Sequence, residues 1–158
     1  PAIRAVHSHR ELELVGVIVA SKKKVGLDAG EIAGIGATGV HATDNWRSVL
    51  DAGADAVIYT ATADIRPEEA MSDLTACLEA GINVVSTAFY TYLHPGSAPQ
   101  EALEPVNALC AKSGASLLPN LPCWNHLIRS SCEIAPSAAA NGSDAASADL
   151  VRSGSTTV

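Results

Sequence analysis

Four runs of apolar residues have the unbroken, β-branched character of strands that are buried on both faces. Between them lie Ala-rich stretches whose larger apolar residues recur at helical spacing. The strands expected from this pattern span Glu13–Ala20, Ala56–Thr60, Ile82–Thr87 and Ala115–Leu118. The helices expected with them are Pro67–Ala80, Ala98–Ser113 and the end of one over Pro1–His9.

The ends of these elements carry recognisable signals. Pro67 suits the first turn of a helix, and Gly81 and Gly114 suit the left-handed position that follows a helix. A weaker unit lies between the first two strands, with a glycine-rich stretch over residues 30–39, a short strand over 40–43 and a helix over 45–52. The resulting βαβαβ order predicts an α/β fold, a parallel sheet with helices on both faces. Such sheets bind ligands at the carboxyl ends of their strands.

The pattern changes after Pro119. Two prolines within Pro119–Pro122 end the fourth strand early. From Ile134 onward, 16 of 25 residues are Ala, Ser, Gly or Thr, so this stretch offers little apolar surface to offset its ordering entropy. We therefore expect a domain over residues 1–133 and a disordered tail over 134–158.

Composition narrows the functional classes. The 158 residues are 47% hydrophobic and 17% charged, which is typical of a globular domain, and the net charge of −7 argues against nucleic-acid binding. No apolar run approaches the roughly 20 residues of a membrane span, and no secretory signal pattern opens the chain. We therefore expect a cytoplasmic protein with reduced cysteines. We expect no bound metal, because Cys123, His126 and Cys132 lack a recurrent ligand spacing.

The first strand runs into Ser21, Lys22, Lys23 and Lys24. Dinucleotide-binding sheets that prefer NAD place an acid at this position for the ribose 2′-hydroxyl, whereas cations there suit the 2′-phosphate of NADP. The acid is absent here, so the lysines are candidate 2′-phosphate ligands. The alternative interpretation is a solvated basic turn.

Small residues follow the next two strong strands and would let a flat ligand approach the backbone. These candidate cofactor-binding residues are Thr60, Ala61, Thr62, Ala63, Ser86, Thr87 and Ala88. Parallel sheets often turn with small residues, so the alternative is a purely structural role. His94 is a further candidate, as a proton donor or simply as a solvated loop residue.

The letters G-x-G-x-x-G occur once, over Gly34–Gly39. No strong strand precedes them and no amphipathic helix opens from them, which is the context a dinucleotide fingerprint requires. We therefore interpret this segment as a loop.

Several phrases, in order, resemble one protein family over about residues 1–118: His9–Val17, Lys24–Gly34, Ala80–Thr87 and Leu93–Pro95. They are similar to the N-terminal domain of the dihydrodipicolinate reductase-like NAD(P)-dependent oxidoreductases, in particular the actinobacterial branch related to 2,4-diaminopentanoate dehydrogenase. The resemblance implies a Rossmann-type domain. It implies binding of NADP, with NAD as the alternative, and hydride transfer to or from an imine or amino-acid-derived substrate.

The same resemblance implies that the domain is incomplete. Pro1 aligns within the family's first helix, so the first strand and its phosphate-binding glycines would lie upstream of it. Leu118–Trp124 departs from the family's turn into the catalytic domain. We expect the chain alone to be inactive, name no catalytic residue, and leave a homo-oligomer of the complete protein open. The alternative is a noncatalytic nucleotide-binding or regulatory module.

Overall fold

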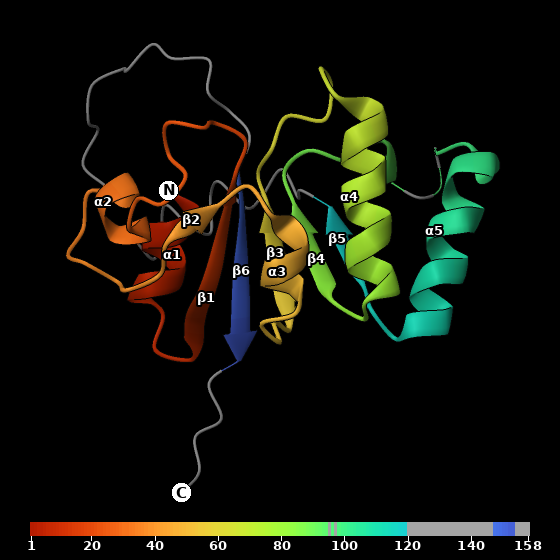
Figure 1. The fold of residues 1–158 in the computed structure, drawn as a ribbon. Helices are drawn as coiled ribbons and strands as arrows, with labels where there is room; N and C mark the ends of the chain where they lie inside the picture. Colours follow the sequence, from red (N-terminus) through yellow and green to blue (C-terminus); the bar gives the residue numbers. More distant parts are fainter. Residues whose placement is uncertain (95, 97, 120–146, 154–158) are drawn as a thin grey trace, which may run out of the picture.

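The computed structural model of the chain describes residues 1–94, 96, 98–119 and 147–153, with side-chain detail for all of these except residues 48, 49 and 147–153 (Figure 1). Its strands are β1 (Leu12–Val19), β2 (Ala42–Thr43), β3 (Ala56–Tyr59), β4 (Asn83–Ser86), β5 (Leu117–Pro119) and β6 (Ser147–Ser153). They form one sheet in the order β2-β1-β6-β3-β4-β5. The α/β fold expected from the sequence is confirmed.

The helices lie close to their predicted positions. They are α1 (Ala2–Ser8), α2 (Ala29–Ala33), α3 (Trp46–Leu50), α4 (Pro67–Glu79), the 3-10 turn η1 (Tyr90–Tyr92) and α5 (Gln100–Ser113). Gly81 and Gly114 take the left-handed conformation after α4 and α5, with φ of +77° and +76°. The short helix α2 was not predicted, because it forms within the glycine-rich stretch. None of the helices in the described ranges has the length and apolar character that a bilayer crossing requires.

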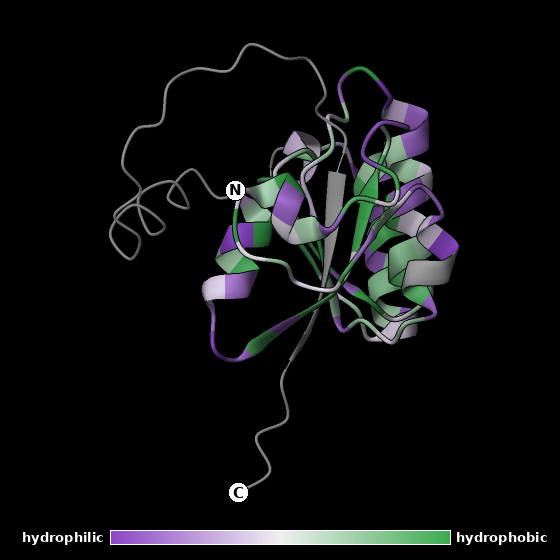
Figure 2. Cartoon of the chain, turned by 60° about the vertical axis from the view of Figure 1, so that its left-hand side comes forward, coloured by the Kyte–Doolittle hydropathy of each residue, from purple (hydrophilic) through white to green (hydrophobic). Residues whose placement is uncertain are grey.

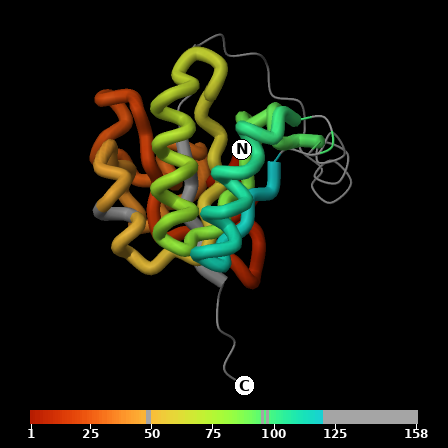
Figure 3. The backbone as a smooth tube through the Cα atoms, turned by 90° about the vertical axis from the view of Figure 1, so that its right-hand side faces the viewer, coloured from red at the N-terminus to blue at the C-terminus, as the bar shows by residue number. Residues whose placement is uncertain are grey.

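Helices cover both faces of the sheet. Along β1, Val17 and Val19 are buried with Ile3 of α1, whereas Ile18 packs against the core that α4 and α5 cover. Because alternate strand residues point to opposite faces, α1 lies on one face and α4 and α5 lie on the other. Figures 1 and 3 show α4 and α5 side by side.

Two apolar clusters form the core. The larger one joins β3 and β4 to α4 and α5 through fully buried residues such as Val57, Leu74, Leu78 and Val84. The smaller one joins β1 and β2 to α1 and α2. In Figure 2 the apolar colour concentrates on the strands, and the polar colour lies on the outer turns of the helices.

β6 corrects the expectation of a disordered tail for residues 147–153. It lies antiparallel between β1 and β3, with Val17 opposite Asp149 and Val57 opposite Leu150, whereas β1–β2, β3–β4 and β4–β5 are parallel. β1 and β3 therefore do not present unpaired edges to each other. Residues 120–146 and 154–158, which include the rest of the expected tail, lie outside the described residues.

The physical reason lies in backbone hydrogen bonding. Composition measures how much side-chain surface a segment can bury, and by that measure this segment is poor. It does not count the N–H and C=O groups of β1 and β3, and leaving a buried amide unpaired costs about 1–3 kcal/mol. A seven-residue strand between them satisfies both rows, at the cost of one register shift between Leu14 and Gly16.

Removing β6 should therefore abolish cooperative folding. We expect a chain that ends at Ala146 to lose its sharp thermal transition, because several losses of about 1–3 kcal/mol exceed much of a typical 5–15 kcal/mol stability. A chain that ends at Ser153 is the matched control and should melt like the full chain. Circular dichroism melts of the three forms test this, and equal transitions for all three would contradict the role assigned to β6.

Candidate functional site

The carboxyl ends of β1, β2, β3 and β4 meet at one edge of the sheet, and β6 enters from that edge with Ser147 opposite Val19 and Ala148 opposite Tyr59. At the usual strand spacing, β1 and β4 lie about 14 Å apart across β6 and β3. The segments that follow the four strands at this edge are Ser21–Lys24, Asp44, Thr60–Ala63 and Thr87–Ala88. The structure thus gathers the predicted site residues along one edge.

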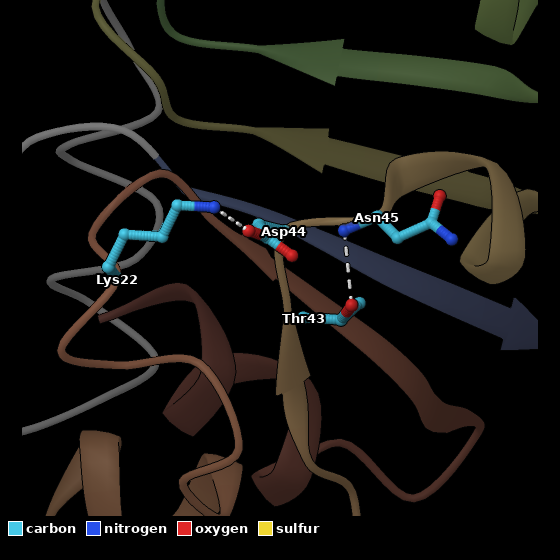
Figure 4. A network of polar contacts seen from close by, with 4 residues as sticks. All are labelled: Lys22, Thr43, Asp44 and Asn45. Carbon is cyan, nitrogen blue, oxygen red and sulfur yellow. Dashed lines mark hydrogen bonds and ion pairs between the residues drawn. The ribbon is translucent and has the colours of Figure 1, made fainter.

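The lysines form a tight turn after β1. The Lys24 N–H donates to the Ser21 carbonyl at 3.0 Å, and the Leu27 N–H donates to the Lys24 carbonyl at 3.1 Å. Lys22 and Lys23 are exposed, whereas Ser21 and Lys24 are half-buried. The Lys22 side chain, 84% exposed, forms an ion pair between its Nζ and the Asp44 Oδ2 (Figure 4).

Asp44 is a residue of this edge that sequence reasoning missed. The acid absent from the end of β1 is supplied by the end of β2, and its pKa is lowered by the hydrogen bond from Lys22 and by the positive charge of that lysine. The Asn45 N–H donates to the Thr43 Oγ1 at 3.1 Å and so shapes the backbone on either side of Asp44. Following the weak second strand to its end would have revealed the residue.

The turns after β3 and β4 are packed against each other. The Thr87 N–H donates to the Tyr59 carbonyl at 3.2 Å, and Thr87 itself is exposed. Ser86 is only 1% exposed, and its Oγ accepts a hydrogen bond from the Ala88 N–H at 2.9 Å. The Ser86 hydroxyl therefore shapes the turn, while Thr87 faces solvent beside it.

The remaining predicted residues of this half differ in exposure. Thr60, Thr62 and Ala63 are half-buried, while Ala61 and Ala88 are buried. The exposed Thr87 is therefore the residue of this half that is most accessible to a ligand.

Three aromatic residues pack against one another next to the turn after β4. The Tyr59 ring stacks on Phe89 with 5.2 Å between centroids, and Phe89 lies 6.4 Å from Tyr92. The Tyr59 hydroxyl donates to the Asp73 Oδ2 at 3.1 Å, and Arg66 pairs with the same carboxylate at 3.5 Å. Burial, followed by the nearby Asp73 charge, raises the pKa of Tyr59 well above its usual range, so this hydroxyl stays protonated.

The G-x-G-x-x-G letters form a loop that holds an internal carboxylate. The Asp28 carboxylate caps α2 by accepting from the Gly30 N–H at 2.7 Å, and it also accepts from the N–H groups of Thr38 at 3.0 Å and Gly39 at 2.8 Å. A Cβ on Gly30 would collide with the Gly36 carbonyl oxygen. The loop lies before β2 rather than after a strand, and the N–H groups of Gly34, Ile35, Thr38 and Gly39 are already hydrogen-bonded within the chain.

Other candidate chemistry is sparse in the part of the chain that the structure describes. No group of three or more His, Cys, Asp or Glu side chains there could hold a metal ion. Cys77 is buried in α4, and burial raises the pKa of its thiol to about 11. His94 is exposed after η1. Cys123, His126 and Cys132 lie outside the described residues.

A family model described as dihydrodipicolinate reductase, N-terminus, matches residues 1–93. The chain belongs to this dihydrodipicolinate reductase N-terminal family. The resemblance drawn from the sequence is thereby confirmed.

Two amine dehydrogenases are similar to this member of the dihydrodipicolinate reductase N-terminal family. An amine dehydrogenase of Streptomyces virginiae is 44% identical over 117 residues, which cover 73% of this chain and 32% of that protein. The solved structure of the amine dehydrogenase from Mycobacterium smegmatis matches with a TM-score of 0.55 and 30% identity, over 66% of this chain and 30% of that one. The chain spans about a third of the length of each relative.

The internal carboxylate of the loop should make stability depend on pH. The three N–H donors hold the pKa of Asp28 at about 2, against an ordinary 3.8. A lowered folded-state pKa stabilises the fold above pH 3.8, and this contribution is lost as the pH falls towards 2. We expect Asp28→Asn to lower the melting temperature by a few degrees at pH 6 and by progressively less between pH 4 and pH 2, as melts across this range would show.

The control is Asp51→Asn, which removes an equal charge from an exposed turn after α3. It should leave the melting temperature unchanged at pH 6. An Asp28→Asn deficit that stays constant down to pH 2 would show that the carboxylate is not what holds the loop.

Proposed function

We propose that this domain binds a nicotinamide cofactor along the carboxyl edge of the sheet and serves an oxidoreductase that moves hydride to or from an imine or an amino-acid-derived amine. The single observation that carries the proposal is the placement of the lysine turn, the Thr60–Ala63 segment and Thr87 along one edge in a chain of this family. The order of a parallel sheet reverses near this point, and ligands of such sheets bind there.

The donor groups present fit the ribose end of the cofactor. Lys22 and Lys23 offer exposed ammonium groups, and Asp44 offers a carboxylate within reach of the same turn. Among the described residues, no glycine-rich turn follows a strand at this edge, so binding by this chain would depend on contacts to the ribose, its 2′-phosphate and the nicotinamide half of the cofactor. Because the lysine turn offers exposed ammonium groups to a 2′-phosphate, we propose that the cofactor is NADP and that its 2′-phosphate binds at this turn.

When bound, the cofactor supplies hydride transfer. The residues of this chain would bind and orient it: the ammonium groups after β1 would hold the ribose phosphate, and the segment with Thr60 and Thr62 would lie along the middle of the cofactor. Ser86 shapes the backbone of Thr87 and Ala88, which would lie next to the nicotinamide. We assign no catalytic acid to the described residues.

An amine or imine substrate is supported by the relatives, since both are named amine dehydrogenases. A cytoplasmic location and a homo-oligomer of the complete protein stay predictions.

A noncatalytic nucleotide-binding module is the second candidate, and β6 favours it. An antiparallel strand occupies the position where the sheet order reverses, between β1 and β3. Such a module would bind nucleotide without turning over an amine. Cofactor reduction by the complete protein, on adding a panel of amines and amino acids, separates the two candidates.

The lysine turn should make NADPH bind more tightly than NADH. A charge-assisted hydrogen bond to the 2′-phosphate contributes about 1.5–3 kcal/mol, and each 1.4 kcal/mol corresponds to about tenfold in affinity. We expect a preference of about tenfold in calorimetric titrations at low salt, which the triple variant Lys22→Ala, Lys23→Ala, Lys24→Ala removes.

Lys112→Ala, which alters the remaining lysine of the chain in the last turn of α5, is the matched control and should keep the preference. Equal affinity of the unaltered chain for both cofactors would contradict the assignment of the 2′-phosphate to this turn.

A further inference from the structure

Asp44 and Lys22 are brought together by the pairing of β1 with β2. Val17 lies opposite Ala42 and Ile18 lies opposite Thr43, so the two strands end at the same level. The chain turns back through Ser21–Lys24 and places the Lys22 Nζ on the Asp44 carboxylate (Figure 4). The contact joins two separate crossover units of the fold and lies at the end of the sheet where the lysine turn is exposed.

Both side chains of the pair are accessible to solvent. The Lys22 side chain is 84% exposed and the Asp44 side chain is 37% exposed. A solvent-exposed ion pair contributes little to stability, so little opposes a rearrangement of these two side chains around a bound group. Asp44 is the acid that the described structure pairs with the lysine turn, and it neutralises one of three adjacent positive charges.

A carboxylate at this point affects the two cofactors differently. It accepts a hydrogen bond from a ribose 2′-hydroxyl, as an acid at the end of a neighbouring strand does in NAD-binding sheets. A 2′-phosphate is repelled by the same carboxylate and must compete with it for Lys22. The lysines therefore favour the 2′-phosphate, and the Asp44 carboxylate reduces that preference.

We propose that Asp44 is a specificity-determining residue, which limits the preference of this site for a 2′-phosphorylated ribose by holding Lys22. The proposal rests on the proposed cofactor site and adds to it a residue from β2. Without Asp44, the three lysines would give the site a stronger preference for the 2′-phosphate. Removing the carboxylate, while keeping the shape of the side chain, should strengthen NADPH binding selectively.

The test uses the full chain and measures dissociation constants for NADPH and NADH by calorimetry at 50 mM and 500 mM salt. For Asp44→Asn we expect NADPH to bind about fivefold or more tightly at low salt, with NADH unchanged or weaker. The gain should shrink at high salt, because exposed charges are then screened. Adding Lys22→Gln to Asp44→Asn should abolish the gain, since the released lysine is what binds the phosphate.

Two controls separate this effect from charge and folding. Asp51→Asn makes the same change in net charge in the turn that precedes β3, at the opposite edge of the sheet, and should leave the preference unchanged. Asp44→Glu keeps the carboxylate and should retain a preference close to that of the unaltered chain. Melting temperatures of all variants confirm that each one folds.

The outcomes distinguish the two proposals. If both cofactors bind and Asp44→Asn leaves their ratio unchanged, or Asp51→Asn alters it equally, the role of Asp44 is wrong while the cofactor site stands. If neither cofactor binds to any folded form, the proposed function is wrong, and the role of Asp44 is overturned with it.

Discussion

The backbone pairing of β6 with β1 on one side and β3 on the other joins two parallel half-sheets into one sheet. The half with β2 and β1 packs on α1 and α2, and the half with β3, β4 and β5 packs on α4 and α5. A buried amide that is left unpaired costs more free energy than a paired amide contributes. The facing edges of β1 and β3 therefore require a strand between them, and β6 fills that place. The position of the β1 end relative to the β3 end at the candidate site follows from the pairing of both strands with β6.

Two carboxylates, Asp28 and Asp44, interact with polar groups in the loops around the sheet. Asp28 accepts hydrogen bonds from the N–H groups of Gly30, Thr38 and Gly39, so these three amides are not available to an external anion. Asp44 forms an ion pair with Lys22 at the carboxyl edge, and both side chains of this pair are exposed. The first arrangement is structural and the second can respond to a ligand, because burial and the number of hydrogen-bond donors differ between them.

The sequence predicted the parts of the fold that depend on local pattern. The buried strands β1, β3 and β4 and the helices α4 and α5 carry unbroken apolar runs or end signals, and they form where expected. α2 was missed because it is a five-residue helix within a glycine-rich stretch, although its cap, Asp28, contacts the nearby Gly30 N–H. β6 was missed because its partners lie more than 85 residues away, and its composition gives no sign of them. At the site, the exposed lysines were predictable, whereas the Lys22–Asp44 pair depends on strand register.

The central claim is that a nicotinamide cofactor lies along the carboxyl edge of a sheet closed by β6. The most direct test is to titrate NADPH into the isotopically labelled chain and follow each backbone amide by nuclear magnetic resonance. The account predicts that shifts concentrate on Ser21–Lys24, Asp44, Thr60–Ala63 and Thr87, with α5 and the Gly34–Gly39 loop unaffected. Shifts centred on the Gly34–Gly39 loop, or no shifts at millimolar NADPH, would contradict it.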